Sequence, residues 1–288
     1  MYTRILVPLD GSKLAEQILP YARAFAVAFA ARVDLLKVDD PEAMVPYLTP
    51  LAGNEYLEKV SRGYFPASVE VDRVVEAGKP AEVIVDRARA ERSTLIAMAT
   101  HGLSGLRRWL LGSVASKVVQ TAVSPVLLVR PVEGGEAPVE IRLNTILVPL
   151  DGSGLAEKIL PHVSAVARKM NLEVCLVRAY VAPPSSYVVA EGSQAYSFDR
   201  VQQQFRREAE EYLKGKTEEL QAEGLRVSVM VVGGDAAEQI IDLARTTQQN
   251  LIALSTHGRS GLKRWVLGSV AEKIVHHSRD PVLIVRPT

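Results

Sequence analysis

The residues best suited to binding an anion lie in a loop that contains glycine and serine, residues 99–114. The loop follows the apolar run Leu95–Met98, which predicts a buried strand, and it ends at Gly112-Ser113, where an apolar helical pattern begins. The first N–H groups of a helix have no partners within the helix, the helix dipole is positive there, and glycine lets a ligand approach the backbone. The spacing therefore predicts an anion site at the start of this helix.

The same stretch occurs a second time near the end of the chain. Residues 254–275 repeat residues 98–119 almost residue for residue, so Gly268-Ser269 corresponds to Gly112-Ser113. Cations flank both copies: Arg107, Arg108 and Lys117 in the first, and Lys263, Arg264 and Lys273 in the second. The preceding glycine and the cations favour phosphate binding over the alternative, in which the serine only caps the helix, as the capping-box pattern Ser269-x-x-Glu272 suggests.

Other motifs limit the chemistry. The pattern Gly-x-x-x-x-Gly-Lys-Ser/Thr does not occur, which argues against a fast phosphotransferase, and no Gly-x-Gly-x-x-Gly follows the first predicted strand, which disfavours NAD. His101 has no catalytic carboxylate or cysteine partner in the sequence, so we interpret it as a turn residue. We interpret Trp109 and Trp265 as packing residues, because both lie in apolar patterns.

The whole chain is duplicated. Residues 5–12 recur unchanged as 146–153, a shift of 141, whereas residues 125–131 recur almost unchanged at a shift of 156. The second half therefore contains 15 additional residues, between its second and third predicted strands. Solenoid repeats are only about 20–50 residues long. We predict two tandem domains, 1–131 and 143–288, joined by a polar linker at 132–142.

Predicted strands and helices alternate within each half. In the first half we expect strands at 4–9, 33–38, 69–75, 94–98 and 125–130, and helices at 14–31, at about 54–62, and beginning near 80 and 113. Val, Leu and Ile on both faces of the strands indicate a parallel sheet covered on both sides. The predicted fold class is α/β, with two tandem doubly wound, Rossmann-like domains, each a five-stranded parallel sheet flanked by helices.

Ligands of doubly wound domains bind beyond the carboxyl ends of the strands, where the strand order changes. The residues predicted at that edge are Pro8, Asp10, Val38, Ala99, Gly102, Gly112 and Ser113 in the first half, and Pro149, Asp151, Ala179, Ser255, Gly258, Gly268 and Ser269 in the second. Asp10 has an alternative and compatible role as the N-cap of the first helix.

Composition excludes several classes of partner. A formal net charge of +1 over 288 residues disfavours a nucleic acid held by bulk electrostatics. No apolar run is long enough to span a bilayer and the N-terminus reads as a strand, so we expect a soluble, cytoplasmic protein with no membrane partner. The single cysteine, Cys175, is interpreted as a small buried residue. We assign no metal-binding residues.

These motifs resemble those of the universal stress protein family in its tandem, two-domain form, over both halves nearly end to end. The resemblance rests on Ile-Leu-Val-Pro-Leu-Asp-Gly-Ser at each start, Thr-His-Gly…Leu-Gly-Ser-Val-Ala near each end, and a closing Pro-Val-Leu-Leu/Ile-Val-Arg-Pro. The ATP-binding branch of the family is marked by Gly-x2-Gly-x9-Gly-Ser/Thr. This chain matches that pattern twice except at its first glycine, which is Ala99 in one copy and Ser255 in the other.

The resemblance implies ATP as the ligand, with or without Mg²⁺. It implies that Pro8, Asp10 and Val38 hold the adenine, and that Gly102, Gly112, Ser113 and Val114 hold the ribose and phosphates. The counterparts are Pro149, Asp151 and Ala179, and Gly258, Gly268, Ser269 and Val270. In the family the first motif glycine lies against the ribose, and the fifth strands pair across a dimer. We therefore expect an internal pseudo-dimer, which leaves further association into a homodimer open.

Three functions follow. The leading hypothesis is an ATP-binding, nucleotide-responsive regulator of the stress response that acts on unidentified protein partners. The alternative is a nucleotide-free interaction module, which Ala99 and Ser255 favour. The third is an enzyme, but the sequence shows no paired acid and base, so we expect no enzymatic activity beyond slow ATP hydrolysis. Gly112→Val should remove nucleotide binding at the first site and leave the fold intact.

The second half also contains a longer amphipathic segment. Its apolar residues at helical spacing are Phe198, Val201, Phe205, Tyr212, Leu213 and Leu220. They predict a helix about four turns longer than its counterpart, either a longer cover for the sheet or a lid or partner surface.

Overall fold

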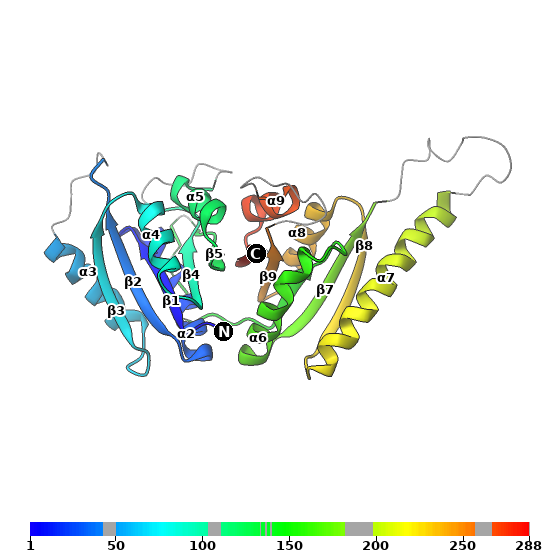
Figure 1. Ribbon diagram of the computed structural model, residues 1–288, viewed down its shortest axis with the longest axis horizontal. Helices are drawn as coiled ribbons and strands as arrows, with labels where there is room; N and C mark the ends of the chain where they lie inside the picture. The colour runs from blue at the N-terminus through cyan, green and yellow to red at the C-terminus, as the bar shows by residue number, and fades with distance from the viewer. Residues whose placement is uncertain are drawn as a thin grey trace.

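A computed structural model (Figure 1) describes the chain in the ranges 1–42, 50–102, 111–132, 134–135, 137–138, 140–181, 198–256 and 267–287. The first half contains, in order, β1 (Arg4–Leu9), α1 (Lys13–Glu16), α2 (Leu19–Phe29), β2 (Arg32–Asp39), α3 (Pro50–Tyr64), β3 (Val71–Ala77), α4 (Pro80–Arg89), β4 (Thr94–Ala99), α5 (Ser113–Thr121) and β5 (Val126–Val129).

The second half repeats this order. It contains β6 (Thr145–Pro149), the 3₁₀ turn η1 (Ala156–Ile159), α6 (Leu160–Met170), β7 (Glu173–Tyr180), α7 (Phe198–Ala222), β8 (Val227–Gly233), α8 (Ala236–Thr246), β9 (Asn250–Ser255), α9 (Ser269–His277) and β10 (Val282–Val285). None of the helices described here is both long and apolar enough to cross a membrane.

All ten strands form one sheet, with the order β3-β2-β1-β4-β5-β10-β9-β6-β7-β8. Strands within each half are parallel, whereas β5 and β10 pair antiparallel, with Leu128 opposite Val282 and Val126 opposite Ile284. The predicted α/β class is confirmed, and so is the predicted pairing of the two fifth strands. The two halves lie on either side of this central pair (Figure 1).

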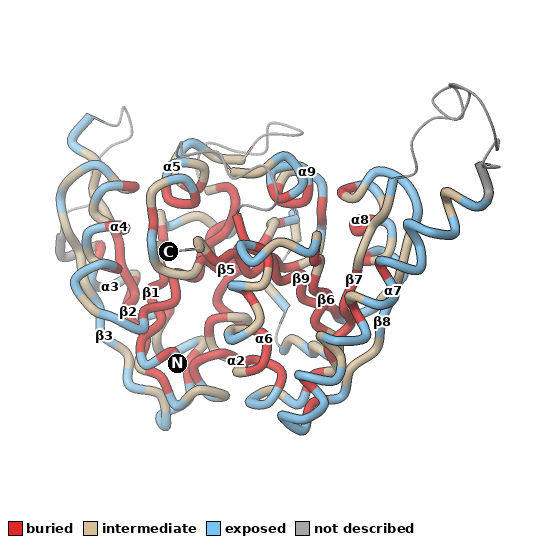
Figure 2. Tube along the Cα trace, turned by 45° about the vertical axis from the view of Figure 1, so that its right-hand side comes forward, coloured by how far each residue is buried: buried red, intermediate tan, exposed pale blue. Residues whose placement is uncertain are grey.

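The sheet separates two apolar layers, both of which continue from one half into the other. Helices α2, α3, α6 and α7 cover one face, and α4, α5, α8 and α9 cover the other. Figure 2 shows the buried residues concentrated in the strands and on the inner sides of the helices. The central strands β4, β5, β9 and β10 are buried along their whole length, as expected for a sheet covered on both faces, whereas the edge strands β3 and β8 have exposed residues.

The helix predicted at 14–31 is not continuous. It is divided between α1 and α2 by Gln17 and Ile18. Pro20 lies in the first turn of α2, where its missing N–H is tolerated; in a continuous helix its ring would clash with the carbonyl of Glu16. The second half has the same break before Pro161 in α6.

Helix α7 is longer than α3, but by less than predicted. It has 25 residues against 15 in α3, so the excess is about 15 Å, or about three turns rather than four. Ala209, Leu213 and Leu220 are buried against the sheet, whereas Phe205 is exposed. The buried part of α7 covers β7 and β8, in agreement with the interpretation of this segment as a longer cover for the sheet.

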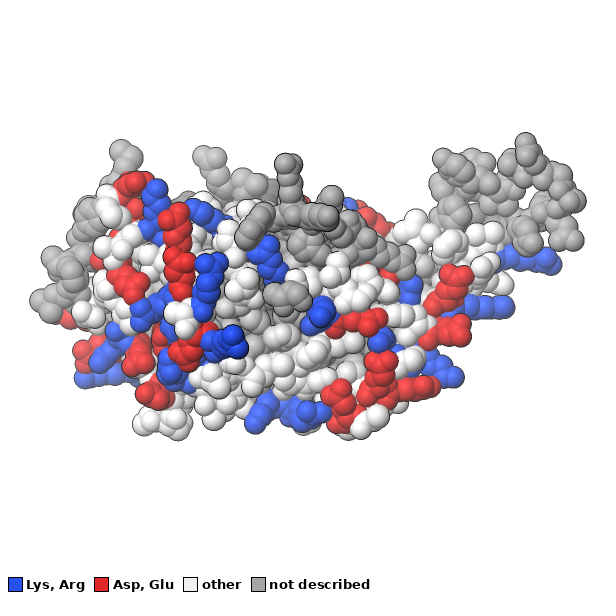
Figure 3. Space-filling view, in the orientation of Figure 1, with Lys and Arg blue, Asp and Glu red and all other residues white. Residues whose placement is uncertain are grey.

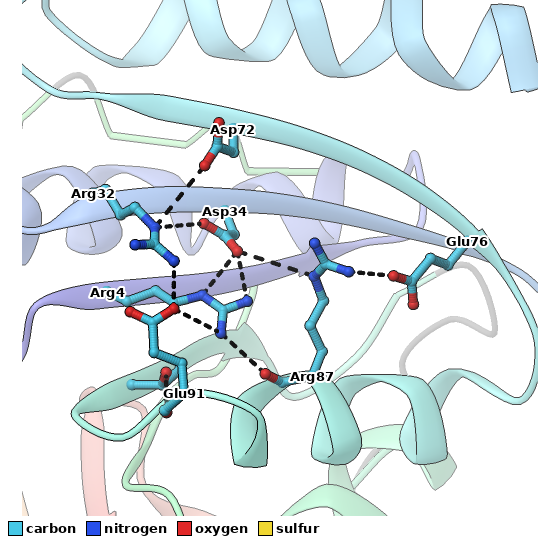
Figure 4. A network of polar contacts seen from close by, with 8 residues as sticks. Arg4, Arg32, Asp34, Asp72, Glu76, Arg87 and Glu91 are labelled. Atoms are coloured by element: carbon cyan, nitrogen blue, oxygen red, sulfur yellow. Dashed lines mark hydrogen bonds and ion pairs between the residues drawn. The ribbon is translucent and has the colours of Figure 1, made fainter.

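A buried cluster of ion pairs lies between the sheet and α4 in the first half (Figure 4). Arg4 donates from Nε and Nη2 to Asp34 Oδ2, at 2.8 and 2.5 Å, and from Nη1 to the carbonyl of Arg87 at 3.0 Å. The described residues of the second half form no such cluster, because residues 145, 175 and 243 at the equivalent places are Thr, Cys and Leu. Cys175 is buried and unbridged, as predicted, and burial raises the pKa of its thiol.

Candidate functional site

Two cavities lie at the carboxyl edge of the sheet, one in each half. The first has a volume of 240 Å³ and is bounded by the ends of β1, β2 and β4 and by the start of α5. All eight residues predicted for the first site line it: Pro8, Asp10, Val38, Ala99, Gly102, Gly112, Ser113 and Val114. Strands β1 and β4 are neighbours from which the strand order runs in opposite directions, so the cavity is at the topological switch point.

The second cavity, of 290 Å³, has the same position in the other half. Seven of the residues predicted for the second site line it: Pro149, Asp151, Ala179, Ser255, Gly268, Ser269 and Val270. The eighth, Gly258, lies outside the described residues, as do Trp109, Trp265 and the cations Arg107, Arg108, Lys263 and Arg264. The geometry gathers the predicted residues, and their contact with a ligand stays a prediction.

The helix starts differ in one respect from the prediction. Gly112 and Gly268 are the N-caps of α5 and α9, and neither cap makes a side-chain hydrogen bond. Each glycine carbonyl accepts the first bond of its helix, from Ser116 N (2.8 Å) and from Glu272 N (2.8 Å), and each glycine N–H bonds back to the strand end, at Thr100 O (2.9 Å) and Thr256 O (2.7 Å). The alternative in which the serines cap the helices is therefore wrong, and so is the capping box at Ser269.

The first turn of each helix consequently presents backbone donors to the cavity. Ser113, Val114 and Ala115 line the first cavity, and their N–H groups belong to the initial set that has no acceptor within the helix. Together with the positive end of the helix dipole, these donors can bind an anion without any basic side chain.

Two glycines at the first cavity are required by close packing. A Cβ atom on Gly112 would lie 2.8 Å from the carbonyl oxygen of Thr100, and one on Gly102 would lie 1.8 Å from Oδ2 of Asp10. Gly112→Val would therefore push against the backbone, and the expectation that it leaves the fold intact is wrong. Gly102 instead makes room for the Asp10 carboxylate at the cavity wall.

Asp10 does not cap the first helix. Its Oδ1 accepts a hydrogen bond from the N–H of Ser12 (2.9 Å), and Ser12 Oγ accepts from the N–H of Ala15 (3.1 Å), so Ser12 is the cap of α1. Asp151 and Ser153 repeat this arrangement in the second half, with the same distances. The turn fixes each aspartate at the end of its strand, where it lines the cavity.

The lysines predicted to flank the phosphate do not line the cavities. Lys117 pairs with Glu82 of α4 (2.9 Å), and Lys273 pairs with Asp235 just before α8 (3.2 Å). Both pairs tie neighbouring helices together at the surface. Figure 3 shows acidic and basic side chains interspersed on the face turned to the viewer, in agreement with the near-zero net charge.

The cavities also have apolar walls that the sequence analysis did not include. Leu36, Pro80, Ile84 and Met98 line the first cavity, and Val177, Ala236, Ile240 and Leu254 line the second. They come from the second and fourth strands of each half and from the helix after the third strand. The sequence analysis placed strands and helices over this part of the chain without singling these residues out, because apolar periodicity does not show which side chains border a space. His101 is buried at the first cavity, with its Nδ1 3.0 Å from Thr100 Oγ1.

A tyrosine of α3 or α7 lies near a glutamate in each half, and an arginine joins the pair in the second half. In the second half, the Arg178 guanidinium lies 4.4 Å from the centre of the Tyr212 ring, and Tyr212 donates to Glu157 (2.8 Å). Burial raises the pKa of Tyr212, and Glu157 raises it further, so the phenol stays protonated. In the first half, Tyr56 is the counterpart of Tyr212, and its pKa is raised by burial first and then by Glu16 and Asp10.

The fold and its cavities define a class: a duplicated, doubly wound α/β protein with one pocket at each topological switch point. Within that class the chain belongs to the universal stress protein family, whose family model matches residues 1–130 and again 143–286. The resemblance read from the motifs is thereby confirmed.

Individual relatives agree. The chain is 28% identical over 141 residues to a universal stress protein of Methanocaldococcus jannaschii, covering 49% of this chain and 81% of the relative. It is 29% identical over 219 residues to one of Mycobacterium bovis, covering 76% and 66%. The crystal structure of a universal stress protein from Archaeoglobus fulgidus covers 100% of both chains with a TM-score of 0.70 at 20% identity, which shows a shared fold.

Proposed function

We propose that this chain binds ATP in its two cavities and acts as a nucleotide-responsive regulator in the stress response. The observation that carries the proposal is the pair of helix starts, Gly112-Ser113 and Gly268-Ser269, each of which borders a cavity at a switch point. Such a start is suited to a phosphate chain. The membership of the chain in the universal stress protein family supports the stress-response part.

The proposed roles follow from the chemistry of the walls. The backbone donors of α5 and α9 would hold the phosphates. The carboxylates of Asp10 and Asp151, which are acceptors, would bind the exocyclic amine of adenine, while the apolar residues of both strands and helices cover its ring. Mg²⁺ would reach the site with the phosphates, since it is usually bound through substrate phosphates and a few carboxylates.

Binding would act by shifting a conformational equilibrium. A ligand present at 100 times its dissociation constant stabilises the state that binds it by about 2.7 kcal/mol, which is enough to change the population of a two-state element about a hundredfold. We propose that partner proteins, in the cytoplasm, respond to this shift and that the chain has no enzymatic role beyond slow ATP hydrolysis.

Serine substitutions at the helix starts test the proposal. Ser113 and Ser269 are exposed first residues of their helices, so a glutamate there is compatible with the fold and with the helix dipole but repels a phosphate. Isothermal titration with Mg-ATP should show two sites in the wild type, one in Ser113→Glu or in Ser269→Glu, and none in the double variant. Glutamine at the same positions is the matched control, and it should retain binding.

Analysis of small molecules released from the denatured wild-type protein adds an independent readout. An adenine nucleotide among them supports the proposal. If no nucleotide is released and Mg-ATP changes neither the heat signal nor the melting temperature, the proposal is wrong and the nucleotide-free interaction module is the better description. The replacement of the first motif glycine by Ala99 and Ser255 is the feature that favours this second candidate.

A further inference from the structure

The second cavity contains a buried hydroxyl group without a partner. Ser255, the last residue of β9, is 9% exposed and lines this cavity. Its Oγ is shielded from solvent and has no hydrogen-bond partner among the residues that the structure describes. Buried hydroxyl groups are nearly always hydrogen-bonded, and an unpaired one lowers stability. An unpaired group in a ligand cavity therefore indicates that its partner is part of the ligand.

The first half provides a control within the same chain. Ala99 ends β4 as Ser255 ends β9, is 7% exposed, and lines the first cavity. The residue after each position makes an equivalent backbone bond, from Thr100 N to Val129 O at 2.9 Å and from Thr256 N to Val285 O at 2.9 Å. The hydroxyl group is thus the difference between the two cavities at this point of the wall.

The strand order indicates which part of a ligand Ser255 would meet. β9 lies between β10 and β6, with β7 beyond β6, and the bond from Gly268 N to Thr256 O places the start of α9 beside the end of β9. An elongated ligand with its anionic end at Gly268-Ser269 and its other end against Asp151 and Ala179 therefore passes Ser255 near its middle. In the nucleotide of the proposed function, on which this step rests, the middle part is the sugar.

We infer that Ser255 is a specificity-determining residue that makes the two sites unequal. In the second cavity its hydroxyl bonds a hydroxyl of the ribose, after rotation about the Cα–Cβ bond, for which three staggered positions exist. The first cavity has only the methyl group of Ala99 at this place. The second site therefore distinguishes ribonucleotides from deoxyribonucleotides, and the first site does not.

The test isolates each site with the helix-start variants. In the Ser113→Glu variant, only the second site is expected to bind nucleotide. This variant is titrated with Mg-ATP, with its 2′-deoxy analogue and with its 3′-deoxy analogue. ATP should bind roughly three- to tenfold more tightly than at least one of the analogues, the range expected for one hydrogen bond. Adding Ser255→Ala should weaken the binding of ATP by that factor and remove the difference in affinity between ATP and its deoxy analogues. On the Ser269→Glu background, the first site should bind all three ligands alike.

The unliganded protein supplies a readout that a purely structural serine would not give. Because Ser255→Ala removes an unpaired hydroxyl, its melting temperature without nucleotide should equal or exceed that of the parent. A lower melting temperature would show that the hydroxyl bonds within the protein and would overturn the inference. Unchanged affinity and unchanged discrimination in Ser255→Ala would also overturn it while ATP binding stands. Failure of all three nucleotides to bind either site would refute the proposed function together with it.

Discussion

Removing one member of the buried Arg4–Asp34 pair should destabilise the fold strongly, whereas replacing the whole cluster by uncharged residues should not. Both side chains are 4% exposed, so removing one leaves the other charge in an environment that solvates it poorly. Loss of one member of a buried pair typically destabilises a protein by about 3–5 kcal/mol. We expect Asp34→Ala to lower the free energy of unfolding by that amount, a large part of the about 5–15 kcal/mol that a native domain has.

The second half shows how the cluster can be replaced. A variant with Arg4→Thr, Asp34→Cys and Arg87→Leu gives the first half the residues that stand at the equivalent places 145, 175 and 243. The remaining partners Arg32, Glu76 and Glu91 are 36%, 37% and 35% exposed, so water can solvate them. Replacing a buried ion pair by apolar groups is often neutral or stabilising, so the triple variant should lie within about 2 kcal/mol of the wild type.

Urea unfolding followed by circular dichroism measures both effects. Lys273→Ala, which breaks an exposed ion pair with Asp235, is the matched control and should leave the midpoint nearly unchanged. A cost of less than about 1 kcal/mol for Asp34→Ala, or a triple variant as unstable as Asp34→Ala alone, would refute this prediction, because the expected loss comes from an uncompensated buried charge.

Two further predictions concern single contacts. Burial, and then the N-terminal ammonium, lower the pKa of His162, whose Nδ1 lies 2.8 Å from the Tyr2 hydroxyl. Because the folded state resists protonation of this ring, the free energy of unfolding should be highest above about pH 6.5, the ordinary pKa of histidine. It should fall as the pH drops below that value, by no more than about 1.4 kcal/mol per pH unit from this group. The difference in the free energy of unfolding between pH 7.5 and 5.5, measured with urea, should be smaller in His162→Gln than in the wild type. An equal difference in the two proteins would contradict the assignment to His162. Gly102→Ala should cost about 1 kcal/mol, because the Asp10 carboxylate must leave its turn, and should cost almost nothing on an Asp10→Ala background; equal costs in both backgrounds would show that the two residues do not interact.

The local chemistry of the sequence was sufficient for much of the architecture. The apolar runs located the strands of the first half to within about two residues, and the duplicated motif placed a helix start after the fourth strand of each half. These features depend on neighbours in sequence: side-chain periodicity, glycine and proline at turns, and the direction of parallel strands. Parallel topology then brings the strand ends to one edge, so the residues predicted there line the two cavities. The pairing of β5 with β10, in contrast, was expected only from the family resemblance.

The tertiary structure decided what depends on residues distant in sequence. It alone shows that Gly102 makes room for Asp10, that Arg4, Asp34 and Arg87 from three elements form one buried cluster, and that Lys117 pairs with Glu82 of a neighbouring helix. It also shows that the glycine, and not the following serine, caps each site helix. A pattern of residue types records whether a position is buried or exposed. Which atoms meet, and which polar atom is left without a partner, is decided only when separate elements pack together.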